Sequence, residues 1–333
     1  DPPTTEIYTV LTSSAASDVY KRQALGTVVA GVAWARLATR RNNRLIRPPV
    51  RDPDGNPLVS NRLQLSDGEV VTWVEAGDGP ALLLIPGADG MKETWRFQIP
   101  ELARRFHVIS ADLRSRFPYP ATFDLFADDA VELLDFLGIE SAIVIGQSLG
   151  GAIAIRLATR YPERVRGLVL ANTLARVSYE HVGLNATALA PVAVAANRYL
   201  PTGAARWLGK LWSRHDVWIF DGSPGWERVV DYALWTGSRT EPPQISSRRI
   251  RLLAPEDLRP ELARIRIPTL VLKGPRDTYT PAAWARDIAD RIPDARYVEI
   301  DDTGHCSHIS MPGEFNRKLV TWLDKLDFEE DGV

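Results

Sequence analysis

The decapeptide Ala142–Gly151, A-I-V-I-G-Q-S-L-G-G, constrains the fold of this chain more than any other stretch. Its first four residues form a continuous apolar run, which is typical of a strand buried on both faces of a parallel sheet. A helical pattern begins directly after Ser148, so the segment predicts a strand, a sharp turn and a helix, with the serine at the apex. Glycines two residues before and two residues after Ser148 allow a tight turn and a close approach of strand and helix. The Ser148 hydroxyl is therefore expected above the carboxyl end of the sheet, near the positive end of the helix dipole.

Further apolar strand runs alternate with helical patterns along the rest of the chain. The short connections between them predict an α/β protein with a doubly wound, mostly parallel sheet of the eight-stranded type. The first two strand runs flank the turn Ser66-Asp67-Gly68-Glu69, whose Asp-Gly pair is typical of a β-hairpin. The predicted strands are 62–65, 70–75, 81–85, 108–111, 142–145, 165–171, 268–272 and 296–300, and the predicted helices are 91–104, 124–137, 149–161, 282–292 and 314–326.

The alternation stops between residues 175 and 262. This segment has no clear strand run and shows helical patterns near 183–197, 203–213 and 226–236. A helical block inserted into an α/β sheet is best interpreted as a lid over the carboxyl ends of the strands, where ligands bind. The predicted core is therefore 62–174 together with 263–327. The segment also holds five of the ten tryptophans, which form either the core of the lid or the wall of an apolar ligand pocket: Trp207, Trp212, Trp218, Trp226 and Trp235.

Residues 1–61 form a predicted N-terminal extension with three parts. Residues 1–23 resemble translated sequencing-adapter sequence and are therefore expected to be an artefact that forms no part of the fold. Residues 24–35 are apolar, and the following stretch to residue 51 carries six arginines and no acidic residue. Twelve apolar residues are fewer than the roughly 20 that span a bilayer. The part 24–51 is thus either a membrane anchor with a basic flank, which keeps the folded domain cytoplasmic, or a short amphipathic or disordered extension.

The composition limits the class of protein and its partners. With 45% hydrophobic and 25% charged residues, the chain resembles an ordinary globular protein and is long enough for one α/β domain with an insertion. A formal net charge of −2 argues against nucleic acid as a partner. The single cysteine, Cys306, excludes an intrachain disulfide and a cysteine-rich metal site. No histidine pair lies at ligand spacing with a carboxylate, so the sequence predicts neither a metal nor another cofactor.

A serine hydroxyl is a poor nucleophile until a base takes its proton, and an imidazole base needs an acid to hold its tautomer. Asp277 follows the strand 268–272 by five residues, and His305 follows the strand 296–300 by five. Both side chains are therefore expected at the carboxyl ends of strands, on the same side of the sheet as Ser148. Three alternatives stay open from the residues alone: Asp277 as an ordinary turn residue, Asp301 or Asp302 as the acid, and His308 as the base.

The segments 62–174 and 263–327 resemble the α/β-hydrolase family. The motifs G-Q-S-L-G-G, G-P-R-D-x-x-x-P and G-H lie where that family places them. The resemblance implies that Ser148 is the nucleophile, His305 the base and Asp277 the acid. A serine at this turn is similar to the esterase, lactonase and peptidase branches, whereas the dehalogenase and epoxide-hydrolase branches carry an aspartate there.

Two backbone N–H groups must face the negative charge that develops on the attacked carbonyl oxygen, and the resemblance assigns them to Leu149 and Ala88, with Asp89 as the weaker alternative to Ala88. Many relatives carry His-Gly where this chain has Pro86-Gly87, and usually glycine where it has Ser115. These departures predict a differently shaped wall of the pocket. We expect the substrate pocket to include Gly87, Gln147 and Trp95.

The sequence therefore predicts a cofactor-free serine hydrolase that cleaves a small apolar carboxylic ester or lactone through an acyl-enzyme. An acyltransferase or a C–C bond hydrolase with the same triad is a second hypothesis. A third is a non-catalytic binding protein similar to maspardin, weakly suggested by the Pro86-Gly87 loop and the short segment 112–123. The expected partner is a small molecule, and the expected location is the cytoplasm, with membrane attachment through 24–51 left open.

Overall fold

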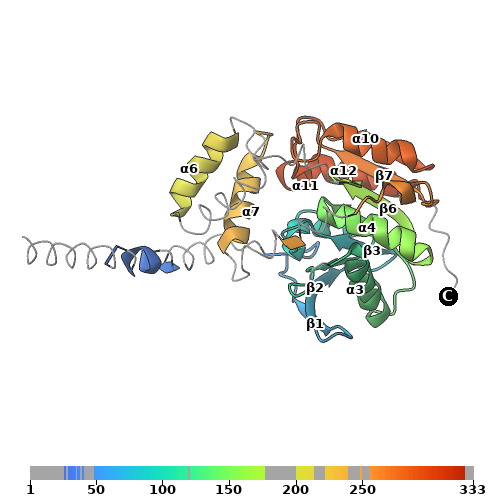
Figure 1. Ribbon diagram of the computed structural model, residues 1–333, viewed down its shortest axis with the longest axis horizontal. Helices are drawn as coiled ribbons and strands as arrows, with labels where there is room; N and C mark the ends of the chain where they lie inside the picture. Colours follow the sequence, from blue (N-terminus) through green and yellow to red (C-terminus); the bar gives the residue numbers. More distant parts are fainter. Residues whose placement is uncertain are drawn as a thin grey trace, which may run out of the picture.

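The computed structural model describes residues 49–118, 121–176, 200–213, 222–238, 248–249 and 256–326, together with short stretches between residues 26 and 40. An eight-stranded sheet forms its centre, in the order β1-β2-β4-β3-β5-β6-β7-β8 (Figure 1). The strands are β1 (Asn61–Gln64), β2 (Val70–Ala76), β3 (Ala81–Ile85), β4 (His107–Ala111), β5 (Ala142–Gln147), β6 (Val165–Ala171), β7 (Thr269–Lys273) and β8 (Ala295–Glu299).

Most of the sheet is parallel. Strands β1 and β2 form the expected antiparallel hairpin, and β2 also pairs antiparallel with β4, whereas the pairs from β4 through β8 are parallel. The turn of the hairpin uses Gly68 at a φ of 83°, a left-handed conformation that glycine adopts without strain. The predicted doubly wound, mostly parallel α/β sheet is confirmed.

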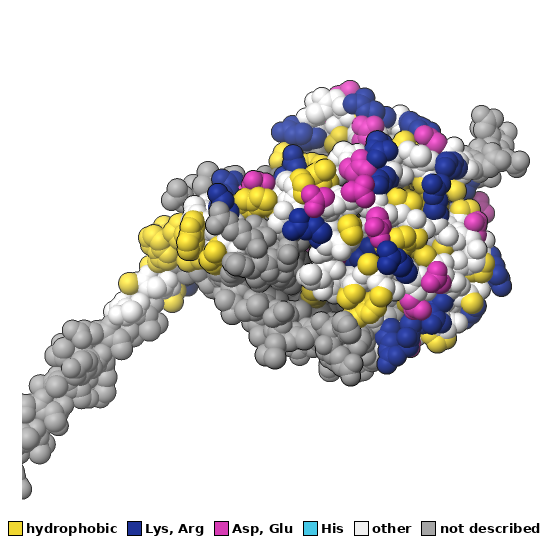
Figure 2. Space-filling model, turned by 90° about the horizontal axis from the view of Figure 1, so that it is seen from above, with side chains coloured by type: hydrophobic (Ala, Val, Ile, Leu, Met, Phe, Trp, Pro, Cys, Tyr) yellow, Lys and Arg dark blue, Asp and Glu magenta, His cyan; other side chains and the backbone are white. Residues whose placement is uncertain are grey.

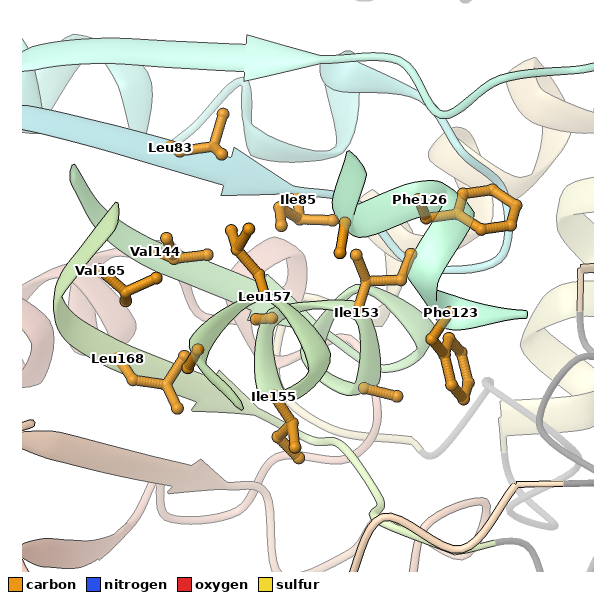
Figure 3. Close-up of a cluster of buried hydrophobic side chains, with 14 of the residues drawn as sticks. Leu83, Ile85, Phe123, Phe126, Val144, Ile153, Ile155, Leu157, Val165 and Leu168 are labelled. Atoms are coloured by element: carbon orange, nitrogen blue, oxygen red, sulfur yellow. The ribbon is translucent and has the colours of Figure 1, made fainter. Parts of the chain in front are cut away.

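Helices cover both faces of the sheet because successive strand residues point to opposite sides. On one face, α3 (Phe123–Phe136), α4 (Leu149–Arg160) and α10 (Ala282–Arg291) pack against strand residues such as Leu83 and Val144 (Figure 3). On the other face, α12 (Pro312–Leu323) packs against their sequence neighbours Leu84 and Ile143. The chain has therefore buried both faces of its central strands, as their continuous apolar runs indicate.

The helix predicted over 91–104 is wrong as a single element. The structure has a short 3₁₀ helix, η1 (Lys92–Trp95), followed by the one-turn helix α2 (Ile99–Leu102). Pro100 lies in the first turn of α2, where a residue without an N–H is tolerated. A continuous helix through this position would lose a hydrogen bond and bring the proline ring against the preceding turn.

Between β6 and β7 the chain inserts helices instead of continuing the sheet. Figure 1 shows α6 (Thr202–Ser213) and α7 (Trp226–Ser238) beside each other, next to the core. Helix α7 packs through Val229, Tyr232 and Trp235 against Met91, Cys306 and other residues of the core. We refer to residues 175–262 as the inserted segment; the helix predicted near 183–197 lies outside the described residues.

The tryptophans of the inserted segment do not behave as one group. Trp235 is buried among the residues that join α7 to the core, and Trp226 packs against the same cluster. Trp207 on α6 is 66% exposed. The side chain of Trp212 and all of Trp218 lie outside the described part of the chain.

The described residues of the N-terminal extension include helical stretches between 26 and 40 with exposed side chains. Among the residues that the structure describes, no helix combines the length and the apolar character that crossing a bilayer requires. On the visible face of the core, Lys and Arg side chains are interspersed with Asp and Glu (Figure 2). Residues 1–23 lie outside the described part.

Candidate active site

Ser148 lies at a strained turn between β5 and α4. Its φ of 53° and ψ of −121° are unusual for a residue with a side chain, and its N–H donates to the Ala171 carbonyl over 3.0 Å. A Cβ atom on Gly146 would lie 2.3 Å from the Gly150 carbonyl oxygen, and one on Gly150 would lie 2.4 Å from the Ile85 carbonyl oxygen. Both glycines of the predicted motif are therefore required, because the backbones of the turn, the helix and β3 nearly touch.

The structure brings Ser148, His305 and Asp277 together in one chain of hydrogen bonds. His305 Nε2 lies 3.0 Å from Ser148 Oγ, and His305 Nδ1 lies 3.0 Å from Asp277 Oδ2. All three residues are buried. Asp277 follows the end of β7, and His305 follows the end of β8. Parallel strands end at the same edge of the sheet, which explains how residues so far apart in the chain meet.

The surroundings of Asp277 keep its carboxyl ionised. Oδ1 accepts the N–H groups of Tyr279 and Thr280, each over 2.9 Å, and Oδ2 accepts the Thr280 hydroxyl over 2.5 Å. Burial raises the pKa of Asp277, but the charges and hydrogen bonds of His305 and Lys273 outweigh burial and hold it well below its usual range. An ionised carboxylate only accepts hydrogen bonds, so Nδ1 of His305 donates to it and Nε2 is left to accept from Ser148.

The alternative acids do not reach the imidazole through any contact in the described structure. Asp302 is exposed and pairs with Arg276 over 3.1 Å. Asp301 has 86% of its side chain exposed and lies 4.0 Å from Lys318. The end of β6 carries no acid, because Asn172 stands there. Its side chain links two loops, since it donates to Ser307 Oγ and accepts the N–H of Gly274, both over 2.7 Å.

The alternative base His308 is a buried packing residue. Its Nε2 lies 3.0 Å from Thr94 Oγ1, and its ring centroid lies 5.0 Å from that of Trp95. Burial, with the nearby His305 and Arg96 charges, lowers the pKa of His308 to about 3. A histidine that stays neutral and points toward Thr94 and Trp95 is poorly placed to serve Ser148.

The loop after β3 lies directly against the serine. A Cβ atom on Gly87 would lie 2.5 Å from Gln147 Oε1 and 3.5 Å from Ser148 Cβ, so a larger residue there would have to displace the Gln147 side chain. Ala88 follows Gly87, and the Gly90 N–H closes the turn on the Gly87 carbonyl over 2.9 Å. Leu149 is the first residue of α4, so its N–H has no partner within the helix. The two predicted donors thus lie on segments that meet at Ser148.

The other two predicted pocket residues have different roles. Gln147 is buried, and its side-chain amide donates to the His305 carbonyl over 3.1 Å, which ties the serine turn to the histidine loop. The prediction that Trp95 lines the substrate pocket is wrong. Trp95 is fully buried in the cluster that α12 covers, where its ring lies 6.2 Å from that of Phe315. The spacing of Trp95, Ile99 and Leu102 was itself a signal of a core-facing helix side.

Three residues at the site are not predicted from the sequence: Lys273, Tyr232 and Arg249. Lys273, the last residue of β7, is fully buried and contacts Asp277; a lysine that ends an otherwise apolar strand was the available signal. Tyr232 and Arg249, both from the inserted segment, contact the loop after β3. No sequence pattern points to those two contacts, because they depend on how the segment packs.

Among the described residues, no group of three or more His, Cys, Asp and Glu side chains is arranged to hold a metal ion. Both ring nitrogens of His305 and Nε2 of His308 already have the hydrogen-bond partners given above. The chemistry that this arrangement supports is proton transfer from a serine hydroxyl to an imidazole that a carboxylate orients.

Comparison with known proteins agrees with this geometry. The family model described as alpha/beta hydrolase fold matches residues 80–312. RutD of Azorhizobium caulinodans, whose name describes a carbamate hydrolase, is 30% identical over 262 residues, which cover 75% of this chain and 94% of RutD. The 3-oxoadipate enol-lactonase 2 of Acinetobacter baylyi is 29% identical over 261 residues, which cover 75% and 91% of the two chains.

Solved structures show the same similarity. The thermophilic esterase of Thermogutta terrifontis superposes with a TM-score of 0.61 and 25% identity, and the match covers 80% of this chain and 98% of the esterase. The family match extends over most of the chain and includes the strand ends that carry Ser148 and His305. The chain therefore belongs to the α/β-hydrolase fold family.

Proposed function

We propose that this protein is a serine hydrolase that cleaves a small apolar carboxylic ester or lactone through an acyl-enzyme. One observation carries the proposal: the continuous hydrogen-bonded chain from Asp277 through His305 to Ser148, with both links at 3.0 Å and all three side chains buried. A carboxylate, an imidazole and a hydroxyl in this order are the parts that acyl transfer to serine requires.

The proposed reaction begins with attack of Ser148 Oγ on the substrate carbonyl while His305 Nε2 takes the hydroxyl proton. Asp277 holds Nδ1 and stabilises the imidazolium that forms. The N–H groups of Leu149 and Ala88 donate to the negative oxygen of the tetrahedral intermediate. His305 then passes its proton to the leaving alcohol, and a water molecule cleaves the acyl-enzyme by the same steps in reverse order.

The inserted segment supplies a proposed lid for this site. Helix α7 packs against Cys306, the residue after the proposed base, and against Met91, which follows the loop after β3. A cover in this position excludes water and offers apolar surface to the acyl group. The names of the enol-lactonase and esterase relatives support an ester or lactone as the substrate.

Carbamate hydrolysis is a second candidate, favoured by the similarity to RutD. It uses the same attack on a carbonyl but releases an amine or ammonia instead of an alcohol, so His305 must protonate a more basic leaving group. Acyl transfer to an acceptor other than water, and C–C bond cleavage, use the same first step and differ in what the covered site admits.

The decisive experiment labels the protein with a fluorophosphonate probe, which reacts with an activated serine. Wild type is expected to be labelled and Ser148→Ala is not, whereas Ser66→Ala, a change in the exposed hairpin turn, keeps full labelling. Absence of Ser148-dependent labelling would reject a serine enzyme and favour a binding protein. Panels of p-nitrophenyl esters of rising acyl length, and of carbamates assayed by the release of amine or ammonia, then separate the two substrate classes.

We also propose that residues 24–51 attach the protein to an anionic membrane surface. Val29, Val32, Trp34 and Leu37 are between 47% and 64% exposed in the described helical stretches. Arginines at 36, 40, 41, 44, 47 and 51 follow with no acidic residue among them. Exposed apolar groups beside an uninterrupted basic run are the combination that binds lipid head groups and the outer acyl layer.

A further inference from the structure

Lys273 is a fully buried lysine in direct contact with the proposed catalytic acid. It is the last residue of β7, and neither its side chain nor that of Asp277 is exposed. Its Nζ contacts Asp277 Oδ2 and the Thr280 carbonyl oxygen, and lies 3.0 Å from Thr280 Oγ1. Burying an ammonium group is costly unless it is paired and hydrogen-bonded, and here all three partners belong to the loop that presents Asp277.

The lysine and the imidazole share one oxygen atom. Asp277 Oδ2 accepts from Lys273 Nζ, from His305 Nδ1 over 3.0 Å and from Thr280 Oγ1 over 2.5 Å. The negative charge that would stabilise an imidazolium on His305 is therefore already balanced by an ammonium at the same atom. A protonated His305 would face a neutral pair rather than an isolated carboxylate.

The other titratable groups around His305 do not alter this balance. Tyr279 lies edge-on to His305 with ring centroids 4.9 Å apart, and burial raises its pKa to about 12, so it stays neutral. His308 is kept neutral by burial. Glu299 on the neighbouring β8 pairs with Arg286 and Tyr297, and Arg276 pairs with the exposed Asp302. Among the described side chains that contact His305, Asp277 carries the charge, and Lys273 contacts the same carboxylate oxygen.

We propose that Lys273 is a positioning residue of the triad, which holds the Asp277 carboxylate in place and puts a positive charge beside the oxygen that His305 contacts. The inference rests on the proposed function, in which His305 must be neutral to accept the Ser148 proton. A positive charge near an imidazole disfavours the imidazolium, so the base stays available at a lower pH than beside an unpaired carboxylate.

The test compares the pH dependence of kcat/KM in wild type and Lys273→Met, in the full chain. Methionine keeps the length and volume of the buried side chain and removes the charge. The acid limb of the profile is expected to move to higher pH by on the order of one pH unit. The plateau is expected to fall as well, because the carboxylate loses a donor that orients it.

A matched control is Lys92→Met. Lys92 is also buried and ion-paired, 2.8 Å from Asp112, but it does not contact the triad. The Lys92→Met variant is expected to be less stable than wild type but to keep the acid limb of its kcat/KM profile at the same pH. Lys273→Gln keeps an N–H donor without the charge, so it is expected to restore part of the plateau while leaving the acid limb shifted.

Titration of the His305 imidazole by NMR separates the failure of this inference from failure of the proposed function. Its midpoint is expected to rise in Lys273→Met and Lys273→Gln whether or not the protein hydrolyses esters. A folded variant with an unshifted midpoint overturns the inference. If neither variant folds, the ammonium of Lys273 in wild type is followed by ¹⁵N NMR during a pH titration. Its chemical shift is expected to change at the same pH at which His305 titrates. A Lys273 signal that does not respond to the titration of His305 overturns the inference.

Discussion

The hydroxyl of Tyr232, on α7 of the inserted segment, donates a hydrogen bond to the carboxylate of Asp89 in the loop after β3. Asp89 directly follows Ala88, one of the two proposed oxyanion donors. Although part of the residue is exposed, burial around the carboxylate raises the pKa of Asp89 to about 6, against the lowering effects of Tyr232 and Arg249. The inserted segment therefore controls the environment of a loop that the proposed chemistry depends on.

The first prediction concerns the pH dependence of stability at Asp89. Because the folded-state pKa is raised, the carboxyl is easier to ionise in the unfolded chain, so its ionisation favours unfolding as the pH rises from about 4 to about 6. Relative to Asp89→Asn, the free energy of unfolding of wild type is expected to fall by about 1–3 kcal/mol across this window. Urea unfolding at pH 4 and pH 7 measures the change.

Tyr232→Phe provides the companion measurement. It removes the donor to the ionised carboxylate and is expected to cost about 1–3 kcal/mol above pH 6 and less at pH 4. A difference between wild type and either variant that does not change with pH would contradict the assignment of this titration to Asp89.

The second prediction concerns Arg249, whose fully buried guanidinium donates to carbonyl oxygens of two loops. It reaches Asp89 over 3.0 Å and Arg114 over 2.8 Å. Arg249→Met is expected to lower kcat by about 10–100-fold, since small displacements of oxyanion donors are costly, and to lower the melting temperature.

Its matched control is Arg248→Met, the neighbouring arginine that lies over the Phe117 ring with its charge 4.7 Å from the centroid. This change is expected to alter kcat less than threefold, or about 0.6 kcal/mol. Thermal melting and steady-state kinetics measure both variants. An equal fall in kcat for the two variants would show that the contacts of Arg249 with the loops do not account for its effect on catalysis.

The third prediction concerns Asp277. Asp277→Asn keeps the shape of the side chain but allows the wrong histidine tautomer, so kcat is expected to fall by about 10³–10⁴-fold. Because the folded-state pKa of Asp277 lies below its ordinary value of 3.8, its ionised form contributes stability above that pH, which is lost as the pH falls below about 4. Retained activity in the variant would mean that another acid orients His305.

The fourth prediction tests the tight turn at Ser148. Gly150→Ala would place a Cβ atom 2.4 Å from the carbonyl oxygens of Ile85 and Pro86, and backbone atoms cannot move aside cheaply. A loss of about 3 kcal/mol or more of stability is expected, together with loss of fluorophosphonate labelling. Gly313→Ala, where no atom lies within 4 Å, is the control and is expected to gain about 0.5–1 kcal/mol in helix α12. A stable, labelled Gly150→Ala protein would contradict the close approach.

The fifth prediction concerns membrane attachment. The full chain is expected to sediment with vesicles that contain phosphatidylglycerol and to be released by high salt, because the arginine run is attracted electrostatically. Trp34→Ser with Leu37→Ser is expected to weaken binding by about tenfold or more, since exposed apolar groups insert into the bilayer. Trp207→Ser, which removes a similarly exposed tryptophan from α6, is the control. Equal binding to neutral vesicles would argue against attachment through the basic run.

Local patterns in the sequence determined the sheet, its hairpin and the turn at Ser148. Continuous apolar runs identify buried parallel strands, and paired glycines identify a turn where backbones touch, because both are properties of a few consecutive residues. The positions of Asp277 and His305 also followed, since the ends of parallel strands share one edge of a sheet. The region around Pro100 is where this kind of prediction failed. The apolar spacing predicted one continuous helix, but the proline has no N–H to donate, and the structure has two short helices instead.

Contacts between distant segments were decided only by the tertiary structure. Trp95 turned away from the predicted pocket into the core, while Tyr232 and Arg249 arrived at the loop after β3 from the inserted segment. Lys273 was visible as a lysine at a strand end, but its pairing with Asp277 required the loop to fold back over β7. Sequence patterns report which residues are buried, whereas the identity of a buried partner depends on packing that no periodicity encodes.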